Sequence, residues 1–340
     1  MKNRPIYAWL MAFTVLGFTG CSKSDDSATT LGNWAKRSDF DGYARSDAAS
    51  FVINGKAYLG TGYDGRNRLK DFWEYDPEMN AWIQKADFGG VARSAAVGFA
   101  AAGNGYFTTG YDGINYYNDC WKYDPTANTW TRVADFGGTA RYGAVAFGIN
   151  NKGYVTTGYD GRYLKDFWEY DPAADQWTSK VSIGGSKRMF ASAFVINNIG
   201  YLVGGVDNNT LVSDFWAYDP SKDSWTQKHD IVVNSDDDVS FDDDYTTITR
   251  DHAAAFTIGD TAYLATGENP SLISNVWQYD PKNDLWTERT AFGPGSARIG
   301  AVGFSLGNRG FIATGGAVDR GSPVYDDLWE FQPYVENTNN

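Results

Sequence analysis

The stretch that decides the fold is DFWEYDPEMNAW, residues Asp71 to Trp82, because it recurs along the chain of 340 residues. Its Trp-x-Tyr-Asp-Pro core returns at Trp73, Trp121, Trp168, Trp216 and Trp277, with a degenerate copy at Trp329. A second tryptophan follows each intact tyrosine by seven residues, at Trp82, Trp130, Trp177, Trp225 and Trp286. The chain is therefore built from a repeat of about fifty residues.

The second tryptophan that is missing after Trp329 is found at the other end of the chain. The segment GNWAKRSDFDGYAR, from Gly32, aligns with NAWIQKADFGGVAR, from Asn80. Trp34 is therefore a sixth copy of the second tryptophan, and it has lost the strands that precede it elsewhere. We expect the two ends of the chain to complete one unit.

Each unit has the pattern of four short strands joined by tight turns. In the first unit the expected strands are Ala48–Ile53, Ala57–Gly62, Asp71–Tyr75 and Ala81–Lys85. Asn54-Gly55 is a strong hairpin signal, and Pro77 suits the second position of a turn. A sheet that is apolar on both faces needs a neighbour on each side, which six sheets around an axis provide. We predict an all-β, six-bladed β-propeller closed by an N-terminal outermost strand in the last blade.

The repeat resembles the kelch repeat. In that family an arginine opens the first strand, a small-Gly pair marks the second, Tyr-Asp-Pro the third and tryptophan the fourth. The resemblance covers Asn33 to Pro333. It departs from the family in one respect, since the glycine doublet is Gly204-Gly205 in the fourth unit and Thr-Gly elsewhere. The resemblance implies the same kelch-type propeller.

The predicted organisation is a single propeller at 32–334, preceded by a leader (1–20) and a tether (21–31) and followed by a tail (335–340). The blades are expected at 44–88, 92–136, 140–183, 187–230, 249–291 and 297–333, the last completed by 32–38. An acidic insertion at 231–248 contains six aspartates between Ser235 and Tyr245. It is either a solvated acidic lid or a calcium site, although its spacing matches no ligand loop.

The N-terminus has the pattern of an export signal. Lys2 and Arg4 precede an apolar stretch, Ile6–Phe18, that is too short to cross a bilayer. Cys21, directly after Thr-Gly, resembles the lipid-attachment cysteine of a bacterial lipobox. This resemblance implies a protein that is anchored by lipid to the outer membrane or the cell surface. An ordinary signal that is cleaved elsewhere, with Cys21 incidental, is the alternative.

Charge and composition argue against several classes of function. The formal charge is −13, and −15 without the leader, so nucleic acid is not an expected partner. Radical-copper oxidases share the propeller, but their site uses two His, two Tyr and a Cys crosslinked to one of these Tyr. This chain has only His229 and His252, and Cys120 occupies the core slot that Phe72 fills in the first unit. We expect no copper, no other metal and no cofactor.

An arginine opens the first strand of every unit: Arg45, Arg93, Arg141, Arg188, Arg250 and Arg298. The hairpin register predicts that the first four face Asp64, Asp112, Asp160 and Asp207, in structural ion pairs. Arg250 and Arg298 face Asn269 and Ala317 instead. We expect these two to be unpaired at the channel mouth, where they suit an anionic ligand such as a carboxylate. The alternative for Arg250 is a pair with Glu268 or Asp251.

Other candidate residues lie on the same face. His252 and Glu268, in the hairpin of the fifth unit, could act as acid and base. Tyr63, Tyr111 and Tyr159, in repeated GYDG loops, would stack on sugar rings if they are exposed, or pack their own loops if they are not. Further tyrosines in these loops are Tyr116, Tyr117 and Tyr163.

The leading hypothesis is an exported, lipid-anchored binding module that presents the arginine-rich face to a glycan or an extracellular protein. The kelch resemblance also implies an alternative, because kelch propellers include mutarotases that interconvert anomers of an acidic sugar. A structural envelope scaffold is the third possibility.

Overall fold

The computed structural model describes residues 31–232, 245, 247–293, 297–317 and 323–336. In these residues the chain forms 26 strands and no helix, and none of it could cross a bilayer as a helix. The leader, Cys21 and most of the acidic insertion lie outside the described residues.

The strands form six four-stranded sheets, each a blade. Blade 1 comprises β2 (Ala49–Ile53), β3 (Lys56–Gly60), β4 (Phe72–Asp76) and β5 (Ala81–Lys85). Blade 2 comprises β6 (Val97–Ala101), β7 (Asn104–Thr108), β8 (Cys120–Asp124) and β9 (Thr129–Val133). Blade 3 comprises β10 (Val145–Ile149), β11 (Lys152–Thr156), β12 (Phe167–Asp171) and β13 (Gln176–Lys180).

Blade 4 comprises β14 (Ser192–Ile196), β15 (Ile199–Val203), β18 (Phe215–Asp219) and β19 (Ser224–Gln227), with the two-residue strands β16 (Val206–Asp207) and β17 (Thr210–Leu211) in one of its loops. Blade 5 comprises β20 (Ala254–Ile258), β21 (Thr261–Ala265), β22 (Val276–Asp280) and β23 (Leu285–Arg289). Blade 6 comprises β24 (Val302–Leu306), β25 (Arg309–Ala313), β26 (Leu328–Glu336) and, from the other end of the chain, β1 (Leu31–Lys36).

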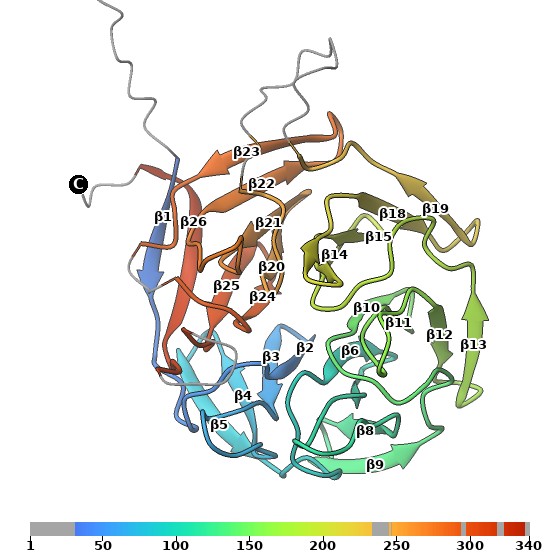
Figure 1. Ribbon diagram of the computed structural model, residues 1–340. Coiled ribbons are helices and arrows are strands. Elements are labelled where there is room, and N and C mark those ends of the chain that lie inside the picture. Colours follow the sequence, from blue (N-terminus) through green and yellow to red (C-terminus); the bar gives the residue numbers. More distant parts are fainter. Residues whose placement is uncertain (1–30, 233–244, 246, 294–296, 318–322, 337–340) are drawn as a thin grey trace, which may run out of the picture.

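The six blades surround a central axis, with the first strand of each blade innermost (Figure 1). The predicted closure is confirmed, because β1 pairs antiparallel with β26. Trp34 lies opposite Phe331 in this pair and is only 4% exposed. The predicted all-β six-bladed propeller is therefore correct.

The turns form where the sequence predicts them. Asn54 and Gly55 both have positive φ, 51° and 75°, as a two-residue hairpin of the favoured type requires. The resulting register places Ala49 opposite Gly60 and continues past the strands to a bridge between Ser46 and Tyr63.

The core lies between the blades. The tyrosines of the Tyr-Asp-Pro motifs are almost fully buried, and Phe51 of blade 1 packs onto Gly105 of blade 2, where an added Cβ would lie 2.0 Å from its ring. The repeat spacing of the twelve propeller tryptophans suggests that all are buried, but the structure shows otherwise. Five are below 9% exposure: Trp34, Trp82, Trp177, Trp277 and Trp286. The other seven are half-buried.

Two sets of loops share one face of the propeller. The loop before Arg93 packs on the loop between the second and third strands of blade 1, through hydrogen bonds from Phe88 N to Lys70 O and from Arg93 N to Leu69 O. We call this surface the mouth face, because the central channel opens there. The residue directly before each inner strand is an alanine that lines this end of the channel: Ala48, Ala96, Ala144, Ala191, Ala253 and Ala301.

Candidate functional site at the channel mouth

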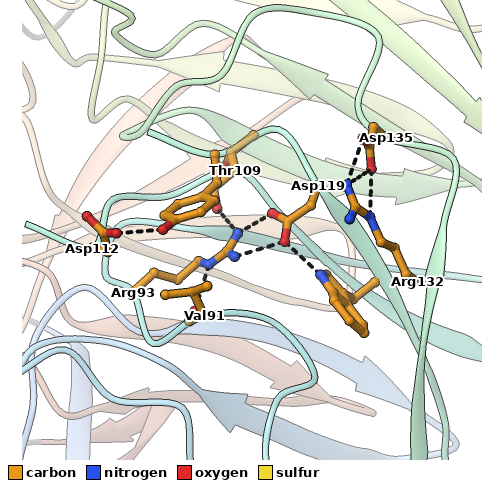
Figure 2. A network of polar contacts seen from close by, with 9 residues as sticks. Val91, Arg93, Thr109, Asp112, Asp119, Arg132 and Asp135 are labelled. Carbon is orange, nitrogen blue, oxygen red and sulfur yellow. Dashed lines mark hydrogen bonds and ion pairs between the residues drawn. The ribbon is translucent and has the colours of Figure 1, made fainter. Parts of the chain in front are cut away.

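The six motif arginines lie beneath the mouth face and are at most 1% exposed. Figure 2 shows the arrangement in blade 2, where Arg93 donates two hydrogen bonds to the Asp119 carboxylate, at 2.5 and 2.9 Å. It also donates to the carbonyls of Val91 and Thr109. Thr109 has a φ of 63°, unusual for a β-branched residue, and this aims its carbonyl at the guanidinium. These arginines hold the loops together.

The predicted carboxylate partners of these arginines are wrong. The ion pairs are Arg45–Asp71, Arg93–Asp119, Arg141–Asp166 and Arg188–Asp214, in place of Asp64, Asp112, Asp160 and Asp207. The register itself is as predicted, but Asp64 accepts hydrogen bonds from the backbone N–H groups of Arg66 and Asn67. An aspartate that closes its own turn in this way is not available to the arginine.

A sequence signal for the true partners was present. An aspartate stands two residues before the first tryptophan of five units, at Asp71, Asp119, Asp166, Asp214 and Asp327, and Asn275 replaces it in the fifth unit. In four of these five units the indole Nε1 of that tryptophan donates to the same carboxylate, as from Trp73 to Asp71 at 2.8 Å. The Asp-x-Trp pair therefore marks five of the six buried arginine sites.

Arg298 and Arg250 are not the exposed cations that the sequence predicted. Arg298 pairs with Asp327 at 2.5 Å, so the prediction that it lacks a carboxylate is wrong. Among the residues that the structure describes, Arg250 has no carboxylate partner, but it is 1% exposed and donates to the carbonyls of Thr247, Ile248, Thr266 and Asn275. Burial lowers the pKa of Arg250 to about 9. Neither guanidinium is accessible to a ligand in this structure.

A ring of backbone hydrogen bonds surrounds the channel mouth. It joins the residues two positions after each motif arginine, and each N–H donates to the carbonyl of the preceding blade at 2.8 to 3.2 Å. The six members are Asp47, Ala95, Gly143, Phe190, His252 and Gly300. All six have φ between 50° and 62°. The ring encloses a cavity of about 160 Å³ and fixes the mouth loops relative to one another.

His252 and Glu268 lie near this ring, on adjacent segments of blade 5. Asp251 and Glu268 exchange two backbone hydrogen bonds, at 3.1 and 3.3 Å. The imidazole Nδ1 of His252 lies 3.1 Å from a carboxylate oxygen of Asp251, and its ring stacks on Phe190 with centroids 3.6 Å apart. Glu268 is half-buried. The structure thus brings a His–Asp pair and a second carboxylate to one side of the mouth.

The predicted tyrosines belong to a longer aromatic series. Tyr111 contacts Tyr116 and Tyr142, Tyr142 contacts Tyr159 and Phe190, and Tyr159 contacts Tyr163, with ring centroids 5.2 to 5.8 Å apart. We call the series the aromatic arc: Tyr63, Tyr111, Tyr116, Tyr142, Tyr159, Tyr163, Phe190 and His252. Every member is half-buried. Burial, followed by the neighbouring phenols and Asp160, raises the pKa of Tyr116, which therefore stays a neutral hydrogen-bonding group.

Arg68 joins the first two tyrosines of the arc, and no sequence pattern predicted this role. Its guanidinium carbon lies 4.4 Å from the ring centroid of Tyr63 and 5.2 Å from that of Tyr111. These are cation–π distances. Arg68, Tyr142 and Phe190 carry no landmark of the repeat, so only the three-dimensional arrangement places them on the site.

The remaining predictions concern Cys120 and metal ions. Cys120 is fully buried, as predicted, and burial raises the pKa of its thiol. Within the described ranges, no group of three or more His, Cys, Asp or Glu is arranged to hold a metal ion. The aspartates between Ser235 and Tyr245 are outside those ranges.

Comparison with known proteins identifies similar repeats and a similar fold. The profile of the KLHDC2/KLHL20/DRC7 Kelch-repeats domain matches residues 137–316, and the Kelch motif matches residues 44–89 and 110–137. The solved structure of YjhT is similar with a TM-score of 0.69 and 17% identity, covering 85% of this chain and 95% of that one. At this identity the likeness concerns the fold alone. No curated protein matches the chain in sequence.

Proposed function

Since this chain belongs to the kelch-repeat family of β-propellers, we propose that it is an exported, membrane-anchored binding module that holds a glycan on its mouth face. The observation that carries the proposal is the aromatic arc, which runs across the mouth from blade 1 to blade 5, with Arg68 linking Tyr63 to Tyr111. Half-exposed aromatic rings offer sugar rings an apolar face beside hydroxyl groups that form hydrogen bonds.

The structure changes which residues are assigned to this function. The sequence pattern favours Arg250 and Arg298 as the ligand-binding residues, but both are buried under the loops. Tyr63, Tyr111 and Tyr159 keep their proposed role as members of the aromatic arc. Their loops are held by the buried Arg–Asp pairs and by the backbone ring, so the arc is pre-organised and a ligand need not order it.

We expect Tyr142→Ala to weaken glycan binding by about tenfold or more, because Tyr142 contacts four other arc rings and a tenfold loss is about 1.4 kcal/mol. The glycan is first chosen by screening an array, and its affinity is then measured by calorimetry. Tyr43→Ala is the matched control, because Tyr43 is 70% exposed on the loop before β2 and lies outside the arc. Equal losses in both variants, or capture of a protein and no glycan, would contradict the proposal.

An acidic-sugar mutarotase is the second candidate, favoured by the His252–Asp251 pair beside Glu268. A His and a carboxylate at one rim suit the proton transfers that open and close a pyranose ring. NMR tests this candidate, because the anomer ratio of an acidic sugar can be followed over time with and without the protein. A binding module leaves the spontaneous rate of anomer exchange unchanged, whereas an enzyme accelerates it and Glu268→Gln abolishes the acceleration.

The anchor is proposed from the leader and Cys21. We expect Cys21→Ser to move the protein from the membrane fraction to the soluble fraction, because a lipid on this residue would be its attachment. The N-terminal peptide of the mature protein, measured by mass spectrometry, should carry a diacylglyceryl group on Cys21. Cys120→Ala is the control and should stay with the membrane. A mature N-terminus at any other residue would refute the anchor.

A further inference from the structure

We infer that Arg68 is the specificity-determining residue of the aromatic arc, and that it recognises the carboxylate of an acidic sugar residue. The inference rests on the proposed function, because it names the class of glycan that the arc binds. It transfers to Arg68 the role that sequence reasoning gave to Arg250 and Arg298.

The first observation is the bonding state of Arg68. Its Nε is buried and has no hydrogen-bond partner in the described part of the chain. There it also forms no ion pair, although five of the six motif arginines pair with an aspartate. A buried N–H without a partner is costly, and one that belongs to a cation more so. Arg68 as a whole is only half-buried, unlike the motif arginines, so an acceptor with negative charge can approach its guanidinium from outside.

The second observation is that nearby carboxylates do not serve as this acceptor. Asp64, on the same loop, accepts the N–H groups of Arg66 and Asn67 and the side-chain amide of Asn67. Asp112, on the neighbouring loop, accepts two backbone N–H groups and the Tyr117 hydroxyl. Although burial alone would raise it, these hydrogen bonds hold the pKa of Asp112 well below its usual range. Both carboxylates are ionised and already occupied by their own turns.

The third observation is orientation. Tyr63 and Tyr111 contact the guanidinium at 4.4 and 5.2 Å, which restrains its plane. The guanidinium lies next to Tyr111, whose ring is 5.5 Å from that of Tyr142 at the centre of the arc. A pyranose on these rings therefore lies within reach of Arg68. A planar guanidinium in a restrained orientation matches the two oxygens of a carboxylate, and a lysine ammonium does not.

The test uses pairs of sugars that differ only in charge. Glucuronate, galacturonate and N-acetylneuraminate, each with its neutral methyl ester, are titrated into the purified full-length protein by NMR. We expect at least one acid to bind about tenfold more tightly than its ester. Arg68→Gln should remove this preference by weakening the acid far more than the ester, and Arg68→Lys should restore only part of it. Arg66→Gln, an exposed arginine on the same loop, should behave as wild type.

The outcomes separate this inference from the proposed function. If acids and esters bind equally, or if Arg68→Gln weakens both to the same extent, Arg68 only supports the tyrosines. The inference is then overturned while glycan binding stands. If no acid or ester binds and the glycan array is also silent, both fail. The affinity of Arg68→Gln for the esters shows in the same titration that the variant is folded.

Discussion

Replacing Asp166 by asparagine should lower the free energy of unfolding by about 2 kcal/mol, because it removes the half-buried carboxylate that compensates the fully buried guanidinium of Arg141. Arg141 is fully buried, and its Nη1 and Nη2 donate to the Asp166 carboxylate at 2.5 and 2.8 Å. Asparagine keeps the shape and one oxygen for the indole N–H of Trp168. The change therefore leaves mainly an uncompensated charge, and the urea dependence of tryptophan fluorescence measures its cost.

Asp160→Asn is the matched control, since it makes the same change on the same loop of blade 3. Asp160 was the partner that the hairpin register predicted, but it accepts the Arg162 N–H within its own turn. Asparagine closes such turns equally well, so the loss should stay below about 1 kcal/mol. Equal losses in the two variants would show that the Arg141–Asp166 pair contributes no more than a surface turn.

The Arg141–Asp166 pair should also make the free energy of unfolding depend on pH in the acidic range. Burial alone would raise the pKa of Asp166, but hydrogen bonds from Arg141 and its charge bring it below the ordinary value of 3.8. A carboxyl with a lower pKa in the folded chain stabilises that chain above its unfolded pKa, and this contribution is lost as the pH falls through the folded pKa. Unfolding free energy should thus fall below about pH 4, and less steeply in Asp166→Asn.

Blade 5 offers the reciprocal change, because Asn275 stands where the other blades have the aspartate. The side-chain amide of Asn275 donates to the Glu288 carboxylate at 2.6 Å. An aspartate at position 275 would therefore be repelled by Glu288 unless Glu288 is replaced by a neutral residue. We expect Asn275→Asp with Glu288→Gln to stabilise the protein by about 1 to 3 kcal/mol through a charged hydrogen bond to Arg250. Glu288→Gln alone is the control. No gain would mean that the four carbonyls around Arg250 already compensate its burial.

The fold was predictable because its sequence landmarks are core residues at fixed spacing. Tyr75 and Trp82 recur in register since each blade buries them against the next, and both are at most 5% exposed. The closing strand was predictable for the same reason, because Trp34 keeps the flanking sequence of the residues around Trp82. Local turn signals such as Asn54-Gly55 then fix the pairing of strands.

The site was less predictable, because register determines which backbones are opposite and not which side chains meet. Ser46 pairs with Tyr63 as expected, yet Arg45 reaches past Asp64 to Asp71. The choice depends on how Asp64 satisfies the N–H groups of its own turn. Arg68 was missed for a different reason: its tyrosine neighbours come from two blades, and Tyr116 stands at the equivalent position of the second unit, so no repeat landmark points to an arginine there.

Replacing Trp34 by alanine should open the ring of blades. It should lower the free energy of unfolding by about 3 to 5 kcal/mol, the range for replacing a buried tryptophan by alanine. Its ring contacts Phe256, Phe292 and Phe331 at 4.7 to 6.3 Å, and its Nε1 donates to Thr290 O. These contacts join β1 to blades 5 and 6. Without them β1 is held mainly by its ladder with β26, so amide hydrogen exchange should accelerate across 31–36 and 328–336.

Trp82→Ala separates this closure effect from ordinary packing. Trp82 is 5% exposed against 4% for Trp34, and it occupies the equivalent place in blade 1. Its strand β5 directly follows β4 of the same blade in sequence, whereas β1 pairs with β26 from the far end of the sequence. Exchange in Trp82→Ala should therefore rise only around 81–85. If β1 amides in Trp34→Ala exchange as slowly as in wild type, the ladder with β26 closes the propeller without the indole.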